Sequence, residues 1–384
     1  MSPGPRLALV AGLLLAAIAT VVGLLMLWPH ASDAPPAVPF LKAGATQYDA
    51  EVVSVNDPCP SRSDDQSVEQ PRMPPHCNEL TFTVLAGPDA GKQLTIQAPP
   101  LVSRAGLVAG DAVTVVRQPP EGGAPASYAF FRIDRNLPIG LMAGALVLVV
   151  ALVARLRGLL ALVGLVIAGL VIGKFMLPAL LAGESGVGVA LAGSAAIMFV
   201  VLYLTHGVSL RTSAALAGTL VGIAITAGLG TWAVSSARLS GVADDYGSQL
   251  LTFDDSLNFR GLLTCAVIVA GLGVLNDVTI TQASAVWELR AASPTMSPAA
   301  LFAAGMRIGR DHIASTIYTI VFAYAGTAMA LLLLLSLYHR PLLELIGDEG
   351  IAEEVVRTLS SAIGLVLAVP VTTAIAVLAT ARTE

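Results

Sequence analysis

Charged and aromatic side chains are scarce in this sequence. Only 12% of its 384 residues are Asp, Glu, Lys or Arg, and 5% are Phe, Trp or Tyr, whereas 55% are hydrophobic. A water-soluble domain of this length exposes far more charge, so most of the chain is expected to face lipid or other helices. The composition therefore predicts an α-helical polytopic membrane protein whose first partner is the lipid bilayer.

Several motifs that would indicate chemistry are also missing. The sequence contains no glycine-rich phosphate loop, no HExxH, no serine elbow and no CxxC. Its net charge of −5 and its scattered Arg residues lack the basic stripe of a nucleic-acid-binding protein. We expect no catalytic residue, no cofactor, no metal, no ATPase machinery and no nucleic-acid partner.

The hydrophobic residues gather in eight runs that are long enough to span a membrane, because about 20 apolar helical residues cross roughly 30 Å of hydrocarbon. The runs lie near residues 7–28, 137–154, 159–181, 187–205, 213–236, 260–276, 313–338 and 361–381. We expect an N-terminal anchor within residues 1–30 and a seven-helix membrane domain within residues 137–384. A cleaved signal peptide is the alternative for the first run, although that run is longer than the apolar part of a signal peptide.

Arg residues indicate which side of the membrane the loops occupy. Arg in short loops stays in the cytoplasm, so both termini are expected there together with the Arg-bearing loops. The residues concerned are Arg6, Arg155, Arg157, Arg211, Arg290, Arg307, Arg310 and Arg382. The preference for Arg over Lys and the many Ala and Gly residues suggest a GC-rich bacterium, and we expect its plasma membrane.

Residues 40–134, between the first two apolar runs, have the pattern of a small all-β domain outside the cytoplasm. Short runs of β-forming residues alternate with turn sequences such as Gly87–Gly91. The expected strands are Gln47–Val55, Glu79–Leu85, Gln93–Gln97, Ala112–Arg117 and Tyr128–Asp134. Five short strands in this length favour an OB-like barrel, with a sandwich fragment as the alternative.

Two of the three cysteines, Cys59 and Cys77, lie in this β domain. On the oxidising side of a membrane, a disulfide between them would contribute roughly 3 kcal/mol by closing a loop. Two free thiols or a metal pair are the alternative. Cys265 lies within the sixth apolar run and is expected to be a packing residue.

The most informative polar residues follow the sixth apolar run. Residues 271–290 contain no helix breaker, and in a helix Asp277, Thr281, Ser284 and Glu288 share one face at spacings of four, three and four. Pro294 ends that helix, and Ser297 with Pro298 predicts the start of another.

The second predicted helix carries Arg307, Arg310, Asp311 and His312. Together the two helices predict a cytoplasmic hairpin over residues 277–312, with acids on one arm and Arg on the other. Such a hairpin is either a gate at the mouth of a pathway or an assembly of ion pairs that holds two spans together. The residue types alone do not decide between these two interpretations.

Two further polar residues lie in or near apolar runs. Lys174 falls within the third run, where it either extends to the membrane surface or lines a pathway, and Pro178 is expected to kink that helix. His206 lies at a predicted cytoplasmic turn, where an interfacial role is favoured over a metal ligand. Glycines such as Gly218 and Gly222 predict close helix packing.

The run Gly271–Arg290, followed by residues 307–316 and preceded by Thr205-His206-Gly207, resembles the YibE/F family of bacterial membrane proteins. The resemblance covers most of the chain and implies an anchor, a β-rich outer domain and a multi-span region. It adds weight to Thr279 and Gln282 beside the polar residues already named, but it implies no chemistry for any of them.

These observations favour a channel-like permease or transporter for an unknown small solute, with the polar hairpin residues and Lys174 along its path. The alternative is an envelope binding or scaffold protein whose outer β domain recognises a partner or a cell-wall component. A membrane enzyme would require His206 or His312 to meet the carboxylates in one deep site. Assembly into a homo-oligomer is left open.

Overall fold

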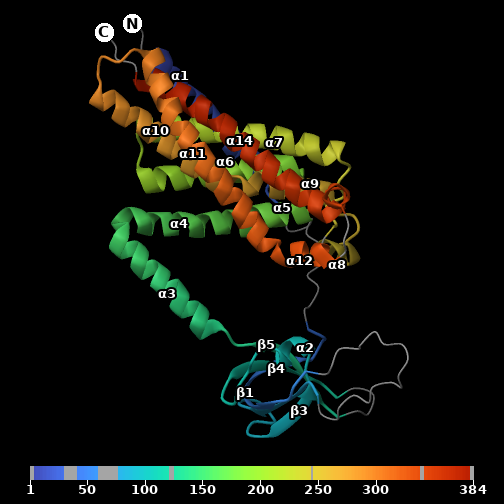
Figure 1. The fold of residues 1–384 in the computed structure, drawn as a ribbon. Helices are drawn as coiled ribbons and strands as arrows, with labels where there is room; N and C mark the ends of the chain where they lie inside the picture. Colours follow the sequence, from blue (N-terminus) through green and yellow to red (C-terminus); the bar gives the residue numbers. More distant parts are fainter. Residues whose placement is uncertain are drawn as a thin grey trace. The chain divides into compact units, whose positions relative to one another are not determined.

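The computed structural model describes residues 4–29, 41–58, 77–120, 125–243, 245–337 and 341–380. Its contacts divide the chain into two compact units, one of residues 36–148 and one of residues 1–35 together with 149–384. The first unit is built around a β-sheet and the second is a bundle of helices (Figure 1).

Five strands form one antiparallel sheet in the order β3-β2-β1-β4-β5. They are β1 (Thr46–Val55), β2 (Glu79–Val84), β3 (Gln93–Gln97), β4 (Ala112–Gln118) and β5 (Ser127–Ile133), with the short helix α2 (Pro100–Ser103) between β3 and β4. Irregularities at Val52–Ser54 and Thr114–Val115 bend the strands. The edge strands β3 and β5 approach each other, so the sheet is curled around a small apolar core that includes Leu80 and Phe82.

All five predicted strands are confirmed to within a residue or two at their ends. The alternation of buried and half-buried residues along β2 shows why the pattern was informative. The finer assignment to an OB-like barrel stays a prediction. Cys77 is disulfide-bonded, but Cys59 lies outside the described residues, so the predicted pairing also stays a prediction.

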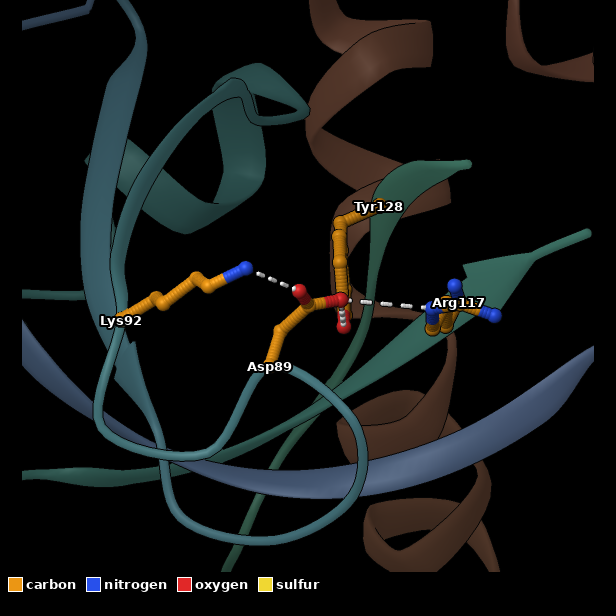
Figure 2. A network of polar contacts seen from close by, with 4 residues as sticks. All are labelled: Asp89, Lys92, Arg117 and Tyr128. Carbon is orange, nitrogen blue, oxygen red and sulfur yellow. Dashed lines mark hydrogen bonds and ion pairs between the residues drawn. The ribbon is translucent and has the colours of Figure 1, made fainter. Parts of the chain in front are cut away.

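A cluster of polar contacts joins the turn between β2 and β3 to Arg117 in β4 and Tyr128 in β5 (Figure 2). The carboxylate of Asp89 accepts hydrogen bonds from Lys92 Nζ at 2.7 Å, Tyr128 Oη at 2.8 Å and Arg117 Nε at 3.4 Å. The turn requires glycine at Gly87, because φ there is +91° and a side chain would overlap the ring of Tyr48. The cluster therefore joins a tight turn to strands β4 and β5.

The helical unit consists of long helices with short connections. In chain order the helices are α1 (Gly4–Met26), α3 (Asn136–Val153), α4 (Arg155–Val171), the π-helix η1 (Ile172–Met176), α5 (Leu177–Leu181), α6 (Gly186–His206), α7 (Leu210–Ser236), α8 (Asp245–Phe253), α9 (Phe259–Ala270), α10 (Leu272–Ala292), α11 (Pro298–Thr327), α12 (Met329–Leu337), α13 (Leu342–Leu345) and α14 (Glu349–Thr380). Helix α3 is shared between the two units, and none of its residues is buried.

Seven stretches of the described chain are helical, long and apolar enough to cross a membrane, and the bent pair α11–α12 makes up to eight. This is compatible with a multi-pass membrane protein. The sixth predicted run was too short, because α9 and α10 form one candidate span from Phe259 to Ala292. The seventh run, predicted near 313–338, is divided between α11 and α12, which meet at a bend of 67° that the sequence did not indicate. The predicted helix start at Pro298 is confirmed.

The helix ends fall into two groups at opposite ends of the bundle. Near the first end, Arg6 Nε in α1 donates a hydrogen bond to the carbonyl of Ala379 in α14 at 3.1 Å, so the start of α1 and the end of α14 lie together (Figure 1). Near the second end, Leu27 lies against Gly188 at the start of α6, and Ser240 N–H donates to Glu349 at the start of α14.

Helices α7 and α14 pack closely at the centre. A side chain at Gly218 would overlap the hydroxyl of Thr372, and one at Gly364 would overlap that of Thr226. Glycine is needed at both positions because the two helix backbones approach closely. The predicted close packing at Gly218 is confirmed.

Candidate functional site

Helix α10 carries four polar residues on one side. Asp277, Thr281 and Glu288 are exposed and Ser284 is half-buried. The predicted helix is confirmed. Its polar stripe points away from the neighbouring helices, because the opposite side of α10 makes the packing contacts.

Helix α11 presents a second set of charges. Its predicted N-cap is confirmed, since Ser297 Oγ accepts a hydrogen bond from the N–H of Ala300 at 3.3 Å. Arg307, Arg310 and Asp311 are all exposed. Among the described residues, no ion pair joins Glu288 to either arginine. The structure therefore does not bring the two charged arms together as the sequence suggested.

One contact does join the polar residues of α10 to those of α11. His312 Nε2 lies 3.9 Å from Asp277 Oδ2, with 68% of the Asp277 side chain and 27% of the His312 side chain exposed. The Nε2 atom itself is buried and has no hydrogen-bond partner in the described part of the chain. At this separation a protonated His312 and an ionised Asp277 attract each other, whereas a neutral His312 gains little.

Contacts on the other side of α10 show how deep this pair lies in the bundle. Thr279 meets Thr219 of α7, and Leu275 meets Gly222, so the two helices run in opposite directions. Asp277 is therefore level with about residue 221 of α7. At about 1.5 Å per residue, that is about 16 Å from Leu210 and about 22 Å from Ser236.

Helix α11 gives the same depth independently. Gly309 packs against Val369 of α14, and Gly305 packs against Thr373. His312 is therefore level with about residue 366, near the middle of the 32-residue α14. The Asp277–His312 pair thus lies at the middle of its neighbouring helices and not at the cytoplasmic mouth that we predicted for these residues.

The buried side of α10 carries two neutral polar residues. The hydroxyls of Thr279 and Thr219, both fully buried, lie 2.6 Å apart. Each hydroxyl also lies within hydrogen-bond distance of a carbonyl in its own helix, Thr219 of Ala215 and Thr279 of Asn276. Because each hydroxyl has one proton, one of the two donates to the other hydroxyl and the second donates to its own carbonyl. This pair joins α7 to α10 without burying a charge.

Gln282 joins three helices. Its side chain is 2% exposed, and its Nε2 donates to the carbonyl of Gly305 in α11 at 2.9 Å and to Thr373 Oγ1 in α14 at 2.7 Å. Gly305 and Gly309 leave the space that the amide fills. The buried polar contacts and the exposed charges therefore occupy opposite sides of the same helix.

Sequence reasoning missed Thr219 and Thr373, because single hydroxyls in apolar runs resemble ordinary small packing residues. One signal was present: Thr212, Thr219 and Thr226 recur at intervals of seven residues, which is two helical turns. All three are fully buried. A repeat of this kind indicates a polar seam along one face of a helix.

The other candidate residues lie apart from this site. Lys174 is exposed on η1 and has no ion-pair partner among the described residues, and Pro178 follows in α5. His206 is half-buried at the end of α6, and Cys265 is a buried free thiol. No group of three or more potential metal ligands occurs in the described part of the chain.

Three grooves on the helical unit have almost wholly apolar linings. The largest, about 420 Å³, lies among α1, α7 and α14, and the others have volumes of about 290 and 280 Å³. None of these three grooves is lined by the polar residues of α10 or by the charged residues of α11. The described site is therefore an exposed face backed by a packed polar interior.

A family model described as YibE/F-like protein matches residues 142–382, which is more than half of the chain and includes the whole candidate site. This match confirms the resemblance seen in the sequence. No curated protein and no solved structure shows significant similarity to the chain.

Proposed function

The chain belongs to the YibE/F-like family, and from that premise we propose that it is a membrane permease or transporter that does not itself use ATP. The observation that carries the proposal is the Asp277–His312 pair at mid-length of the helical bundle. The path for a small solute or ion runs along the charged sides of α10 and α11.

Ionisable residues at this depth favour transport over a purely structural role. An ionised side chain at the centre of a membrane costs about 2.5–3.5 kcal/mol or more, so such residues are usually found where they serve an ion or proton pathway. A structural role would be better served by the neutral contacts of Thr279 and Gln282, which are already present.

Interrupted helices give further support. The third candidate span contains the π-helix η1, the α11–α12 pair bends by 67°, and Pro370 lies inside α14. Transporters commonly place their sites at discontinuous helices, because backbone groups freed from the helix can bind a solute and because such helices move.

The proposed location is the bacterial plasma membrane, with both termini in the cytoplasm and the β-sheet unit outside. Arg6, Arg155, Arg211 and Arg290 lie at or near the helix ends of the first group, which is the distribution that the positive-inside rule favours. In this proposal the β-sheet unit is an OB-like domain that assists or regulates transport. We propose no enzymatic activity and no cofactor for the chain.

The test is flux into liposomes that contain the purified full-length chain and a pH-sensitive dye, with gradients of small solutes applied in turn. We expect Asp277→Asn and His312→Gln to slow proton or solute flux by at least about tenfold, equivalent to about 1.4 kcal/mol in the barrier. Asp255→Asn, the same change at an exposed loop position, is the matched control. Equal rates for all well-folded variants would refute the proposal.

The packed interior and the apolar linings of the three grooves favour a second candidate, an envelope binding or scaffold protein. In that case the outer β-sheet unit recognises a partner, and the helices serve as its platform. Deletion of residues 40–134 separates the two: a transporter keeps part of its flux, whereas a binding protein loses its ligand entirely.

A further inference from the structure

The helices α10 and α11 pack against each other, and their exposed sides carry charges of both signs; we name this set of residues the charged face. Helix α10 contributes the acids and α11 contributes both arginines and one further acid. The residues are Asp277, Glu288, Arg307, Arg310 and Asp311.

The depth of this face makes it unsuited to contact with lipid. Gln282 bonds to Thr373, seven residues inside the end of α14, and Asp277 lies deeper still. Charged residues in membrane-spanning helices almost always face other helices or a water-filled path. With 68% of the Asp277 side chain exposed in the single chain, the site is incomplete without something to cover it.

The charges complement a second copy of the same face. Asp277 contacts His312, and Arg310 is two residues before His312 on α11. Asp277 and Arg310 therefore lie at nearly the same height along the bundle. A two-fold axis along the bundle keeps heights equal in both copies, so Asp277 of one copy can meet Arg310 of the other, and the reverse.

Small residues between the charges permit the close approach that such a contact needs. Thr281 and Ser284 on α10, and Ala303, Ala314 and Ser315 on α11, interrupt the larger side chains along the face. Small side chains are typical of helix interfaces within membranes because they let backbones approach.

We propose that the chain forms a two-fold homodimer through the charged face, so that the Asp277–His312 pairs of the two copies line a shared path at their interface. The inference rests on the proposed function for the placement of this face within the membrane. Its experiments measure association and not flux, so the two proposals can fail separately.

The first experiment measures the mass of the full-length chain released from lipid nanodiscs. We expect twice the mass of one chain. Two charge-segregated variants identify the face: Asp277→Arg with Glu288→Arg makes it mainly positive, and Arg307→Glu with Arg310→Glu makes it wholly negative. Each variant alone repels itself and is expected to be monomeric, whereas the two mixed with different tags form heterodimers.

A cross-linking experiment decides the question if a variant folds poorly. Single cysteines at Ser284 or Ala314, on the charged face, are expected to give covalent dimers in membranes with a short thiol cross-linker. Leu165→Cys, at an apolar position that is 66% exposed on α4, is the control and is expected to give none. A monomeric wild-type chain, dimers that persist in both variants, or cross-linking equal to the control would overturn the proposal.

Discussion

Two aspartates, one in each unit, show how differently the units use a carboxylate. Asp89 in the sheet accepts hydrogen bonds from Lys92, Tyr128 and Arg117, and these contacts lower its pKa to about 2. Asp277 in the bundle has one ionisable neighbour among the described ion pairs, His312, at 3.9 Å. A carboxylate surrounded by donors stabilises a fold, whereas one with few partners is free to bind a proton, a cation or another chain.

The comparison extends to the neutral groups. In the sheet unit the polar cluster lies at the surface and includes charges, whereas the polar groups that join α10 to its neighbours are neutral: the amide of Gln282 and the hydroxyls of Thr219 and Thr279. The two sides of α10 therefore differ: the buried side holds the helices together, and the exposed side carries the charges.

The largest expected effect on stability comes from the closest helix contact. Gly218→Ala places a methyl group against Thr372, whose Cβ would lie only 2.9 Å away, so α7 and α14 must move apart. We expect a loss of about 2–3 kcal/mol in the free energy of unfolding in detergent.

Gly228→Ala is the matched control for that change. It lies on the same helix α7, and a methyl group there meets nothing within 4 Å. It should be neutral or stabilise by about 0.5–1 kcal/mol, because alanine favours a helix over glycine. Equal losses for both variants would show that α7 and α14 are not packed as described.

The next effect concerns the amide that joins three helices. Gln282→Leu removes the hydrogen bonds to Gly305 and Thr373 while keeping most of the side-chain volume. We expect a loss of about 1–2 kcal/mol in the same unfolding assay. Thr281→Ala, on the exposed side of the same helix, is expected to change little. The reverse ranking would contradict the assignment of the two sides.

These two sides could be foreseen only in part from the sequence. Helical periodicity correctly grouped Asp277 with Thr281 and Glu288, but it does not say which side of a helix points inward. That is decided by partners 60 and 91 residues away along the chain, Thr219 for Thr279 and Thr373 for Gln282. The strands were easier to predict, because turn residues and local alternation mark them without reference to distant partners.

The predicted end of the sixth span was wrong for the same physical reason, because it too depends on distant partners. Asn276 and Asp277 looked like the point where the chain leaves the membrane, yet Val278 and Thr279 are fully buried between neighbouring helices. Polar residues that find partners within the bundle do not end a span.

A third prediction concerns Asp89, whose carboxylate accepts three hydrogen bonds. Asp89→Asn removes the charge that Lys92 and Arg117 contact, so we expect faster amide hydrogen exchange in the turn over residues 87–92. The folded pKa of Asp89 is about 2, below its ordinary 3.8. The stabilisation is therefore present above about pH 4 and is lost as the pH falls through 2.

The difference in exchange between variant and wild type, measured at matched pH, should shrink over that range. Glu51→Gln, an exposed acid on the same sheet, is the control and should leave the turn unchanged. A difference that stays constant down to pH 2 would mean that the carboxylate charge does not hold the turn.

The smallest effect is expected at the hydroxyl pair. Thr279→Val keeps the side-chain shape and removes the 2.6 Å contact with Thr219, which should cost about 0.6 kcal/mol, the average for hydrogen bonds between membrane helices. The double variant with Thr219→Val measures the coupling between the two residues. A loss above that of Gln282→Leu would show that the hydroxyl pair is the main link between helices.

The most direct test of the central claim is whether position 277 meets water within the membrane. Full-length chain that carries Asp277→Cys would be placed in liposomes and treated with a charged, water-soluble thiol reagent. Leu165→Cys, at an exposed apolar position on α4, is the comparison. We expect reaction at position 277 well above that of the unsubstituted chain and none at position 165. An unreactive cysteine at 277 beside an unreactive one at 165 would contradict a polar path along the charged face.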